Sequence, residues 1–573
     1  MKLHGHLSGL SPQAVRSLER LYRRRVQEDA LYNQELARHL VEASVLASRQ
    51  VGVLVGRNGA VEYVIAGDAS KLDLPDLGRH RAAEGRFRGL RLVHTHLHGE
   101  DLTQDDIVDL VRLRLDLVCA LILDAGELAR VTYAYNVPGV PGELPYRKIG
   151  PLAPSVLAVK PLTLVRELEG ELARRRQGRE VVAKDGRAIL VHVATNESES
   201  SGVHKRAEAE ASMRELCELA RTAGVEVVHT EIQLRPRLDA RYVMGRGKLD
   251  DIILRAAELD AELLVFDRNL SPAQAAAVAT LSEMKVIDRT QLILDIFAQR
   301  AESKDGKLQV ELAQLKYALP RLGQKDDSLS RLTGGIGGRG PGETKLEIGR
   351  RRARERVTHL EGELKELAKH RTERRRRRAQ RGIPTIAIVG YTNAGKTTLL
   401  RALTGDDVQA SNQLFATLET RSRMLKVGFA GHGGREIVVT DTVGFIRELP
   451  KDLLAAFRAT FEETADAELL VHVVDASDAA WRDHIETTDR LLEDLGLDKV
   501  PCVIALNKWD QADTKRRGEC RLGEPRAIPV SALDRSSLVP LVDAIAAGLA
   551  ERWERAATIP TFEIEAINAE LDS

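Results

Sequence analysis

The sequence predicts a multidomain α/β protein. Runs rich in β-branched residues alternate with helical segments along most of the 573 residues. This length exceeds what one hydrophobic core supports, at about 150 residues per domain. Near residue 385 a β-run leads into a glycine-rich loop and a helix, the pattern of a phosphate-binding α/β domain. We therefore expect such a domain near the C-terminus, preceded by other α/β and helical parts.

Composition narrows the class of protein. Hydrophobic residues make up 43% and charged residues 30% of the chain, as in globular proteins. No apolar run approaches about 18 residues, and the first ten residues lack the apolar core of a signal peptide. The four cysteines show no CxxC spacing, which argues against a disulfide framework or a zinc knuckle. We expect a cytoplasmic protein without a membrane span, and a monomer.

Residues 1–180 predict an N-terminal α/β extension. A helical stretch covers 11–47 and is followed by strand-like runs. These runs are VGVLVG, VEYVIAG, LRLVHTH, LDLVCALIL and ARVTYAY. A proline-rich segment and a charged helix near 162–177 close the region.

Residues 187–303 predict a second α/β domain. Strand-like runs begin at 188, 225, 261 and 285, and each is followed by a helical segment. Such alternation produces a parallel sheet with crossover helices. In the third crossover, Ser271 and Pro272 form an N-cap and an N1 proline. The run Gly245–Lys248 is glycine-rich, and we interpret it as a helix cap rather than a phosphate cradle.

Residues 304–382 predict a helical hairpin. Leucines at 308, 312, 315, 319 and 322 follow a heptad spacing, and Val357, Leu360, Leu364 and Leu367 repeat it. The segment between them, 323–342, contains seven glycines and cannot build a core. Two seams joined by such a segment indicate an antiparallel arm with this segment as its tip.

The second helix of the arm is strongly basic. Residues 350–381 contain 14 Lys or Arg against five Glu in a chain whose net charge is zero. A concentrated basic segment indicates contact with nucleic acid, and the alternative is a solvated helix face. The RNA-contacting residues that we predict are Arg339, Lys345, Arg350, Arg351, Arg352, Arg374, Arg375, Arg376, Arg377 and Arg378.

Residues 383–555 predict the domain that carries the chemistry, and 556–573 form a tail. Gly390-x4-Gly395-Lys396-Thr397 follows a β-run and opens a helix. Its backbone N–H groups suit the α- and β-phosphates of a nucleotide, the lysine reaches the β/γ oxygens and the threonine hydroxyl binds Mg²⁺. Thr417 can join the Mg²⁺ shell, while Asp441 can hold a Mg²⁺-bound water and the Gly444 N–H can sense the γ-phosphate.

The run Asn507-Lys508-Trp509-Asp510 identifies the base. The Asp510 carboxylate can accept from guanine N1–H and the 2-amino group, and adenine would leave it unpaired. We expect Asn507 to tie this loop to the P-loop, Lys508 to lie along the ring and the Ala532 N–H to meet guanine O6. The sequence thus predicts GTP or GDP with Mg²⁺. The remaining predicted nucleotide contacts are Tyr391, Thr392, Asn393, Ala394, Thr398, Phe415, Thr442, Val443, Ser531 and Leu533.

These motifs resemble the HflX GTPases. The resemblance rests on GYTNAGKTTL, FATLE, DTVGFIRELP, NKWD and the preceding GGIGGRGPGETKLE, and it covers about 187–555. It implies a GTPase that binds the 50S ribosomal subunit and its rRNA, is activated there, and splits stalled or idle ribosomes, particularly under stress. It also implies possible K⁺ coordination at Asn393, although we favour a loop-stabilising amide.

Phe445 stands where many GTPases carry a glutamine that positions the attacking water. An apolar side chain cannot orient water. We therefore expect slow intrinsic hydrolysis that a partner or a rearranged switch stimulates.

A second constellation lies in the N-terminal extension. His94 and His96 end a strand, and Asp106 begins a helix. Two imidazoles and a carboxylate can hold Zn²⁺. The pattern resembles the JAB/MPN metalloprotease motif, with Thr103 in the serine position, a spacing one residue short and Gln50 in place of a glutamate. We interpret the histidines as structural and satisfied, with metal binding and an active protease as alternatives.

Two other functions stay open at this point. One is an RNA-binding or ATP-dependent RNA-remodelling factor. The other is a zinc-dependent isopeptidase fused to a regulatory GTPase.

Overall fold

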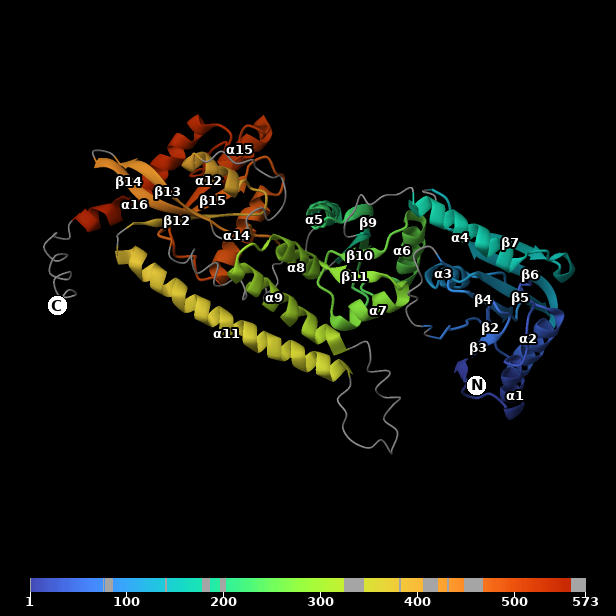
Figure 1. Ribbon diagram of the computed structural model, residues 1–573. Helices are drawn as coiled ribbons and strands as arrows, with labels where there is room; N and C mark the ends of the chain where they lie inside the picture. Colours follow the sequence, from blue (N-terminus) through green and yellow to red (C-terminus); the bar gives the residue numbers. More distant parts are fainter. Residues whose placement is uncertain are drawn as a thin grey trace. The chain divides into compact units, whose positions relative to one another are not determined.

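The computed structural model describes residues 2–75, 77, 86–139, 142–177, 186–195, 202–323, 345–380, 383–405, 421–429, 432–447 and 467–557 (Figure 1). The chain divides into two compact units. The first comprises Met1–Ala209, Gly224–Phe266 and Ala273–Ile287, and the second comprises Glu210–Ala223, Asp267–Pro272 and Asp288–Ser573. Three sheets with helices between their strands confirm the α/β class.

The first unit begins with a seven-stranded mixed sheet. Within the described residues its order is β1-β3-β2-β4-β5-β6-β7. Its strands are β1 (Leu3–Gly5), β2 (Val51–Gly56), β3 (Val61–Ala66), β4 (Leu90–His96), β5 (Leu117–Asp124), β6 (Glu127–Asn136) and β7 (Tyr146–Leu152). The five central strands match the predicted runs, whereas β1 and β7 were not predicted.

Four α-helices accompany this sheet in the described part of the chain: α1 (Pro12–Leu21), α2 (Gln34–Ala47), α3 (Gln104–Arg112) and α4 (Pro161–Gln177). The predicted helical stretch 11–47 is two helices rather than one. Asn33 begins the second, because its side chain accepts a hydrogen bond from the Leu36 N–H at 2.8 Å. The buried faces of α1 and α2 share one core cluster with β2, which places this core against the sheet.

The predicted second α/β segment forms a four-stranded sheet of order β11-β10-β8-β9. Strand β8 pairs in parallel with both β9 and β10, as the alternation of strands and helices predicted. The elements are β8 (Arg187–Thr195), α5 (Gly202–Thr222), β9 (Glu226–Arg235), α6 (Arg246–Leu259), β10 (Leu263–Phe266), α7 (Pro272–Ser282), β11 (Lys285–Asp288) and α8 (Arg289–Arg300). Gly245 is the N-cap of α6, which agrees with a cap rather than a phosphate cradle.

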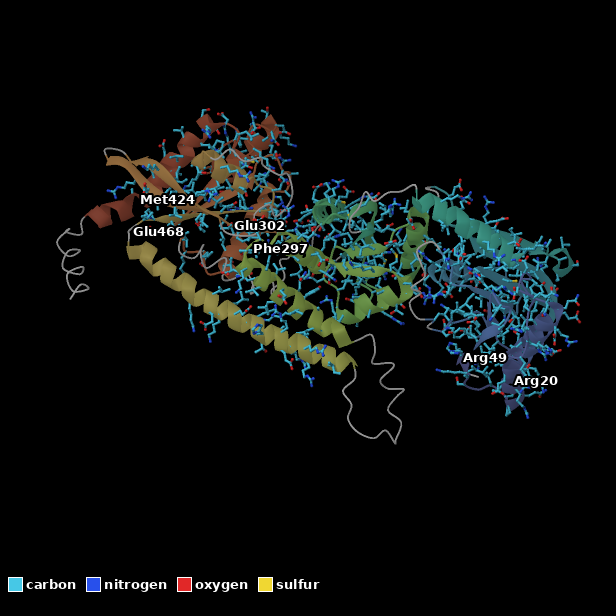
Figure 2. All side chains as sticks on the ribbon, viewed as in Figure 1. Arg20, Arg49, Phe297, Glu302, Met424 and Glu468 are labelled. Carbon is cyan, nitrogen blue, oxygen red and sulfur yellow. The ribbon has the colours of Figure 1, made fainter. Side chains whose placement is uncertain are left out.

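In the second unit, α8 carries the fully buried Phe297 (Figure 2) and is followed by the predicted hairpin of α9 (Lys304–Ala318) and α11 (Lys345–Gln380). Leu308 and Leu312 of α9 are buried together with Leu360 of α11, as the heptad spacing predicted. The seam is shorter than expected, because α9 ends at Ala318 and residues Leu319–Gly323 form a 3-10 helix. Pro320 has no N–H to continue an α-helix.

The C-terminal sheet has the order β13-β14-β12-β15-β16-β17 within the described residues. Strand β12 lies parallel to β14 and β15, β15 lies parallel to β16, and β13 forms an antiparallel hairpin with β14. The elements are β12 (Thr385–Val389), α12 (Lys396–Thr404), β13 (Arg421–Phe429), β14 (His432–Asp441), β15 (Leu469–Asp475), α14 (Trp481–Asp494), β16 (Cys502–Asn507), α15 (Thr514–Gly523), β17 (Ile528–Pro529) and α16 (Val539–Ala557).

Across the described residues, no helix is both long enough and apolar enough to cross a membrane.

Candidate functional site

Three of the predicted nucleotide-binding segments lie at one edge of the C-terminal sheet. Gly390 follows β12, Asp441 ends β14 and Asn507 ends β16. These strands run parallel, so their carboxyl ends meet at the same edge, where open α/β sheets bind ligands.

The P-loop depends on two glycines. Gly390 has φ +144°, and a Cβ there would lie 2.2 Å from the Val473 carbonyl oxygen. Gly395 has φ +91°, and a Cβ there would lie 2.3 Å from Asn507 Nδ2. Asn393 has φ +62°, a conformation that asparagine tolerates better than most residues. Its side chain is exposed and makes no hydrogen bond within the described part of the chain, so the predicted amide contact is not seen.

Lys396 occupies the phosphate position of the loop. Its Nζ donates hydrogen bonds to the carbonyl oxygens of Gly390 at 3.0 Å and Tyr391 at 2.8 Å. Burial lowers the pKa of Lys396 to about 8, against the opposing effect of the Asp441 carboxylate. The Lys396 ammonium group therefore bonds two carbonyl oxygens here, and phosphate oxygens could replace them when a nucleotide binds.

The side chains of Thr397 and Asp441 are in direct contact. The Thr397 hydroxyl donates to Asp441 Oδ2 at 2.7 Å, and Asp441 is fully buried. A hydroxyl and a carboxylate at this separation are hard oxygen donors of the kind that Mg²⁺ prefers. Gly444 closes the pocket, since a Cβ there would lie 3.0 Å from Lys396 Nζ and 2.9 Å from Thr392 Cγ2.

Phe445 is part of the loop framework. Its N–H donates to the Gly390 carbonyl at 3.0 Å, and its own carbonyl accepts from the Thr392 N–H at 2.7 Å. The side chain is among the largest fully buried ones in the protein. Phe445 therefore holds the switch segment against the P-loop and presents no polar group to a water.

The base-recognition loop is anchored by Asn507. Its Nδ2 donates to the Ala394 carbonyl at 2.8 Å, which is the predicted tie to the P-loop. Its Oδ1 accepts from the Ala532 N–H at 3.0 Å. We expected this N–H to meet guanine O6, but here it is engaged by an amide, so guanine would have to share it. Lys508 Nζ contacts Asp475 Oδ2 at 2.6 Å, and Asp510 is exposed.

Some predicted residues fall elsewhere. Phe415, Thr417 and Arg339 lie outside the described residues. Thr442 faces the sheet, because its hydroxyl donates to the Ile388 carbonyl at 2.7 Å. Leu533 is 77% exposed. Thr398 lies in α12, whereas Val443 and Ser531 lie in loops, and no side-chain bond to the pocket is described for these three residues.

The basic arm is seen in part. Arg351, Arg352 and Arg354 are exposed on α11, and Arg350 is partly exposed. Arg351 lies 3.6 Å from Glu355, whereas no described acidic residue pairs with Arg350, Arg352 or Arg354. The α11 backbone includes Lys345 and Arg374, Arg375, Arg376, Arg377 and Arg378, whose side chains lie outside the described ones.

Sequence reasoning missed a network behind the P-loop, all within the second unit. The Tyr391 hydroxyl donates to Glu215 Oε1 of α5 at 2.5 Å, and Glu215 Oε2 lies 2.8 Å from Arg289 Nη2. Arg289 also contacts Asp267 at 2.6 Å. We predicted Tyr391 as a nucleotide contact, and the structure shows that its side chain is buried with its hydroxyl bonded in this network. No local pattern marks Glu215, since it lies 176 residues from its partner.

Comparison with known proteins agrees with this geometry. Three family profiles match consecutive ranges: the N-terminal region of GTP-binding GTPases at 210–298, their middle region at 300–378 and a 50S ribosome-binding GTPase at 385–508. The GTPase HflX of Caldanaerobacter subterraneus is 44% identical over 64% of this chain and 81% of its own length. The chain belongs to the HflX family of GTPases. It therefore binds guanine nucleotides and hydrolyses GTP.

Two further proteins are similar to parts of this chain. The GTPase HflX of Escherichia coli is 42% identical over 57% of this chain and 74% of its own length. A GTP-binding protein from Sulfolobus solfataricus, crystallised with GDP, is 24% identical over 64% of this chain and 99% of its own, with a TM-score of 0.34. None of the three matched profile ranges includes residues 1–209.

Proposed function

We propose that this HflX-family GTPase acts on cytoplasmic ribosomes: it binds the 50S subunit and its rRNA, and it uses GTP binding and hydrolysis to split stalled or idle ribosomes under stress. The observation that carries the proposal is the position of Phe445. A switch without a water-orienting group suits a factor that waits for a partner, and the matched profile of a 50S ribosome-binding GTPase indicates which partner.

Within the pocket, we assign roles by the contacts described above. Lys396 neutralises the β/γ-phosphates, and the Gly444 N–H reports the γ-phosphate. Thr397, Asp441 and the predicted Thr417 hold Mg²⁺, which would supply charge neutralisation for the departing phosphoryl group. Asp510 is exposed, and no described residue bonds its carboxylate, so this carboxylate is available to guanine; Arg517 Nη2 donates only to its backbone carbonyl, at 3.4 Å.

Hydrolysis then depends on what reaches the γ-phosphate. The Phe445 side chain is apolar and buried, and its backbone N–H and carbonyl are both hydrogen-bonded to the P-loop. This residue therefore cannot bring a polar group to the γ-phosphate. In such enzymes, a charged group that a partner supplies to stabilise the transition state raises the hydrolysis rate by about 10³- to 10⁵-fold. We propose that 50S binding reorganises the switch and completes the site.

The arm supplies a surface for RNA. Arg350, Arg352 and Arg354 present cationic groups with no described acidic partner. Such groups neutralise phosphates and release counterions, which makes binding salt-dependent.

The experiment measures two readouts on the full chain. Turnover is compared without ribosomes, with 30S and with 50S subunits, and 70S ribosomes are sedimented with GTP, GDP or a non-hydrolysable analogue. We expect a large stimulation by 50S alone, and conversion of 70S to subunits with GTP or the analogue but not with GDP. Equal turnover in all three conditions, or intact 70S ribosomes throughout, would contradict the proposal. Lys396→Ala serves as the nucleotide-binding control.

A further inference from the structure

The first unit contains a buried cluster that the GTPase site does not use. His94 and His96 lie on β4, and because strand side chains alternate they share one face. Asp106 lies in the first turn of α3. The side chains of the two histidines are 0% and 1% exposed, and that of Asp106 is 11% exposed. Polar groups this deeply buried require partners.

Three potential ligand atoms converge in this cluster. The two Nε2 atoms lie 2.9 Å apart. His94 Nε2 lies 3.1 Å from Asp106 Oδ1, and His96 Nε2 lies 3.5 Å from Asp106 Oδ2. All three residues can offer one ligand atom within 4.8 Å of the others.

The surroundings orient two of these groups. His96 Nδ1 lies 3.0 Å from the Glu100 carbonyl oxygen, an acceptor, so Nδ1 carries the proton and Nε2 keeps its lone pair. The Thr103 N–H and hydroxyl both donate to Asp106 Oδ2, each at 2.7 Å. The lone pair of His96 Nε2 and the Asp106 carboxylate are therefore both held in place by hydrogen bonds to neighbouring groups. In metal sites, such hydrogen bonds orient the ligands.

Hydrogen bonds alone satisfy the cluster poorly. His96 Nε2 and the Asp106 carboxylate are both hydrogen-bond acceptors. A neutral His94 can offer them at most one proton, on its Nε2. If that proton is on Nε2, His94 Nδ1 is a buried acceptor, and the described residues offer it no hydrogen-bond partner. In that tautomer, an interpretation of His94 as a purely structural residue leaves one of its buried nitrogens without a described partner.

A divalent ion resolves the central conflict. Zinc binds nitrogen and carboxylate oxygen at about 2.0 to 2.2 Å in a tetrahedron, which separates ligand atoms by about 3.3 to 3.6 Å. The two Nε2 atoms lie 2.9 Å apart, and they lie 3.1 and 3.5 Å from Oδ1 and Oδ2 of Asp106, so the donor atoms are about as close together as zinc ligands are. Two imidazoles select a transition-metal ion over Mg²⁺ or Ca²⁺, which prefer oxygen ligands.

We propose that His94 Nε2, His96 Nε2 and the Asp106 carboxylate form a zinc-binding site in the N-terminal extension, with the fourth position open to a water. The enclosure of both histidines limits that fourth ligand to a small molecule. This site is independent of the proposed ribosomal function and of the Mg²⁺ ligands in the second unit.

The test uses the full chain, stripped with a chelator and then reloaded with Zn²⁺ alone, without nucleotide. Zinc content after desalting should be one equivalent in the wild type and in His98→Ala, an exposed histidine of the same segment. His94→Ala and Asp106→Asn should lose most of it. Asp106→Asn keeps an acceptor for Thr103, so the helix cap survives. Reloading with Co²⁺ should give the visible absorption of a tetrahedral ion in the wild type and in His98→Ala, and not in His94→Ala or Asp106→Asn.

Folding is checked separately. GTP binding by each variant should match the wild type, because the nucleotide pocket uses none of these residues. If His94→Ala fails to fold, the Asp106→Asn and Co²⁺ results decide the question. A wild type that retains no zinc, or equal zinc in wild type and Asp106→Asn, would overturn the proposal and leave a metal-free hydrogen-bonded cluster.

Discussion

Tyr391 of the P-loop donates a hydrogen bond to Glu215 of α5 at 2.5 Å, and the same hydroxyl accepts from the Arg447 N–H in the switch at 2.9 Å. Burial, followed by the Glu215 carboxylate, raises the pKa of Tyr391, so the hydroxyl keeps its proton. The ring also stacks on His484 at 3.9 Å. One side chain thus joins the P-loop, the switch and a helix outside the nucleotide-binding sheet.

Tyr391→Phe should keep the stacking and remove both hydrogen bonds. Leaving buried partners unpaired costs about 1 to 3 kcal/mol, and we expect the free energy of unfolding to fall by this amount. Tyr32→Phe is the control, since its hydroxyl is buried and no described residue bonds it. Denaturant unfolding of both variants measures the difference, and a double-mutant cycle with Glu215→Gln isolates the pair. A coupling energy near zero would show that the contact contributes nothing.

GTP affinity should depend on pH through Lys396. Burial places the pKa of the free site at about 8, and a bound phosphate raises it, because the anion favours the charged amine. Affinity should therefore be full below about pH 8 and decrease as the pH rises through that value. Calorimetry at pH 8.5 in buffers of different ionisation enthalpy should show proton uptake on binding. Constant affinity from pH 7 to 9 would contradict the assigned pKa.

Gly444→Ala should weaken GTP binding. The new Cβ would approach Lys396 Nζ and Thr392 Cγ2 at 3.0 and 2.9 Å, and such overpacking costs about 1 to 3 kcal/mol. We expect a loss of affinity of about tenfold or more in an equilibrium titration. Gly349→Ala on α11 meets no atom within 4 Å and should leave affinity unchanged. Unchanged binding in Gly444→Ala would remove this residue from the phosphate pocket.

Phe445→Gln should not create a fast GTPase. The side chain at this position is enclosed and its backbone is bonded to the P-loop, so a buried amide destabilises the fold by about 1 to 3 kcal/mol. Single-turnover hydrolysis should remain far below the rate reached with a stimulating partner. Phe445→Leu is the packing control. A Gln variant that hydrolyses GTP quickly on its own would mean that the side chain does reach the attacking water.

Replacing Arg350, Arg352 and Arg354 together with alanine should weaken binding to the 50S subunit. Each lost phosphate contact reduces the slope of log affinity against log salt by about 0.7 to 0.9. Arg356→Ala is the matched control, because its guanidinium is held by Glu311 at 2.7 Å. Sedimentation at several salt concentrations measures both slopes. Equal slopes for all proteins would place the RNA contact elsewhere.

Much of the fold was predictable because its signals are local. Alternating strands and helices, the Gly390 loop and the heptad leucines each depend on neighbours within a few residues. Strand β1 was missed because three residues carry no periodicity. Long-range contacts were also missed, since no spacing rule links Tyr391 to Glu215. The Ala532 N–H was assigned to guanine on motif grounds, whereas in the structure the Asn507 amide accepts its hydrogen bond.

That amide has a consequence for how the enzyme can change over evolution. The Asn507 side chain connects the base-recognition loop to the P-loop, because it hydrogen-bonds both the Ala394 carbonyl and the Ala532 N–H. A substitution of Asn507 would disturb both the selectivity for the base and the affinity for the phosphates. A compensating change in one loop could not restore both properties. We therefore expect changes of nucleotide preference to arise at residues other than Asn507.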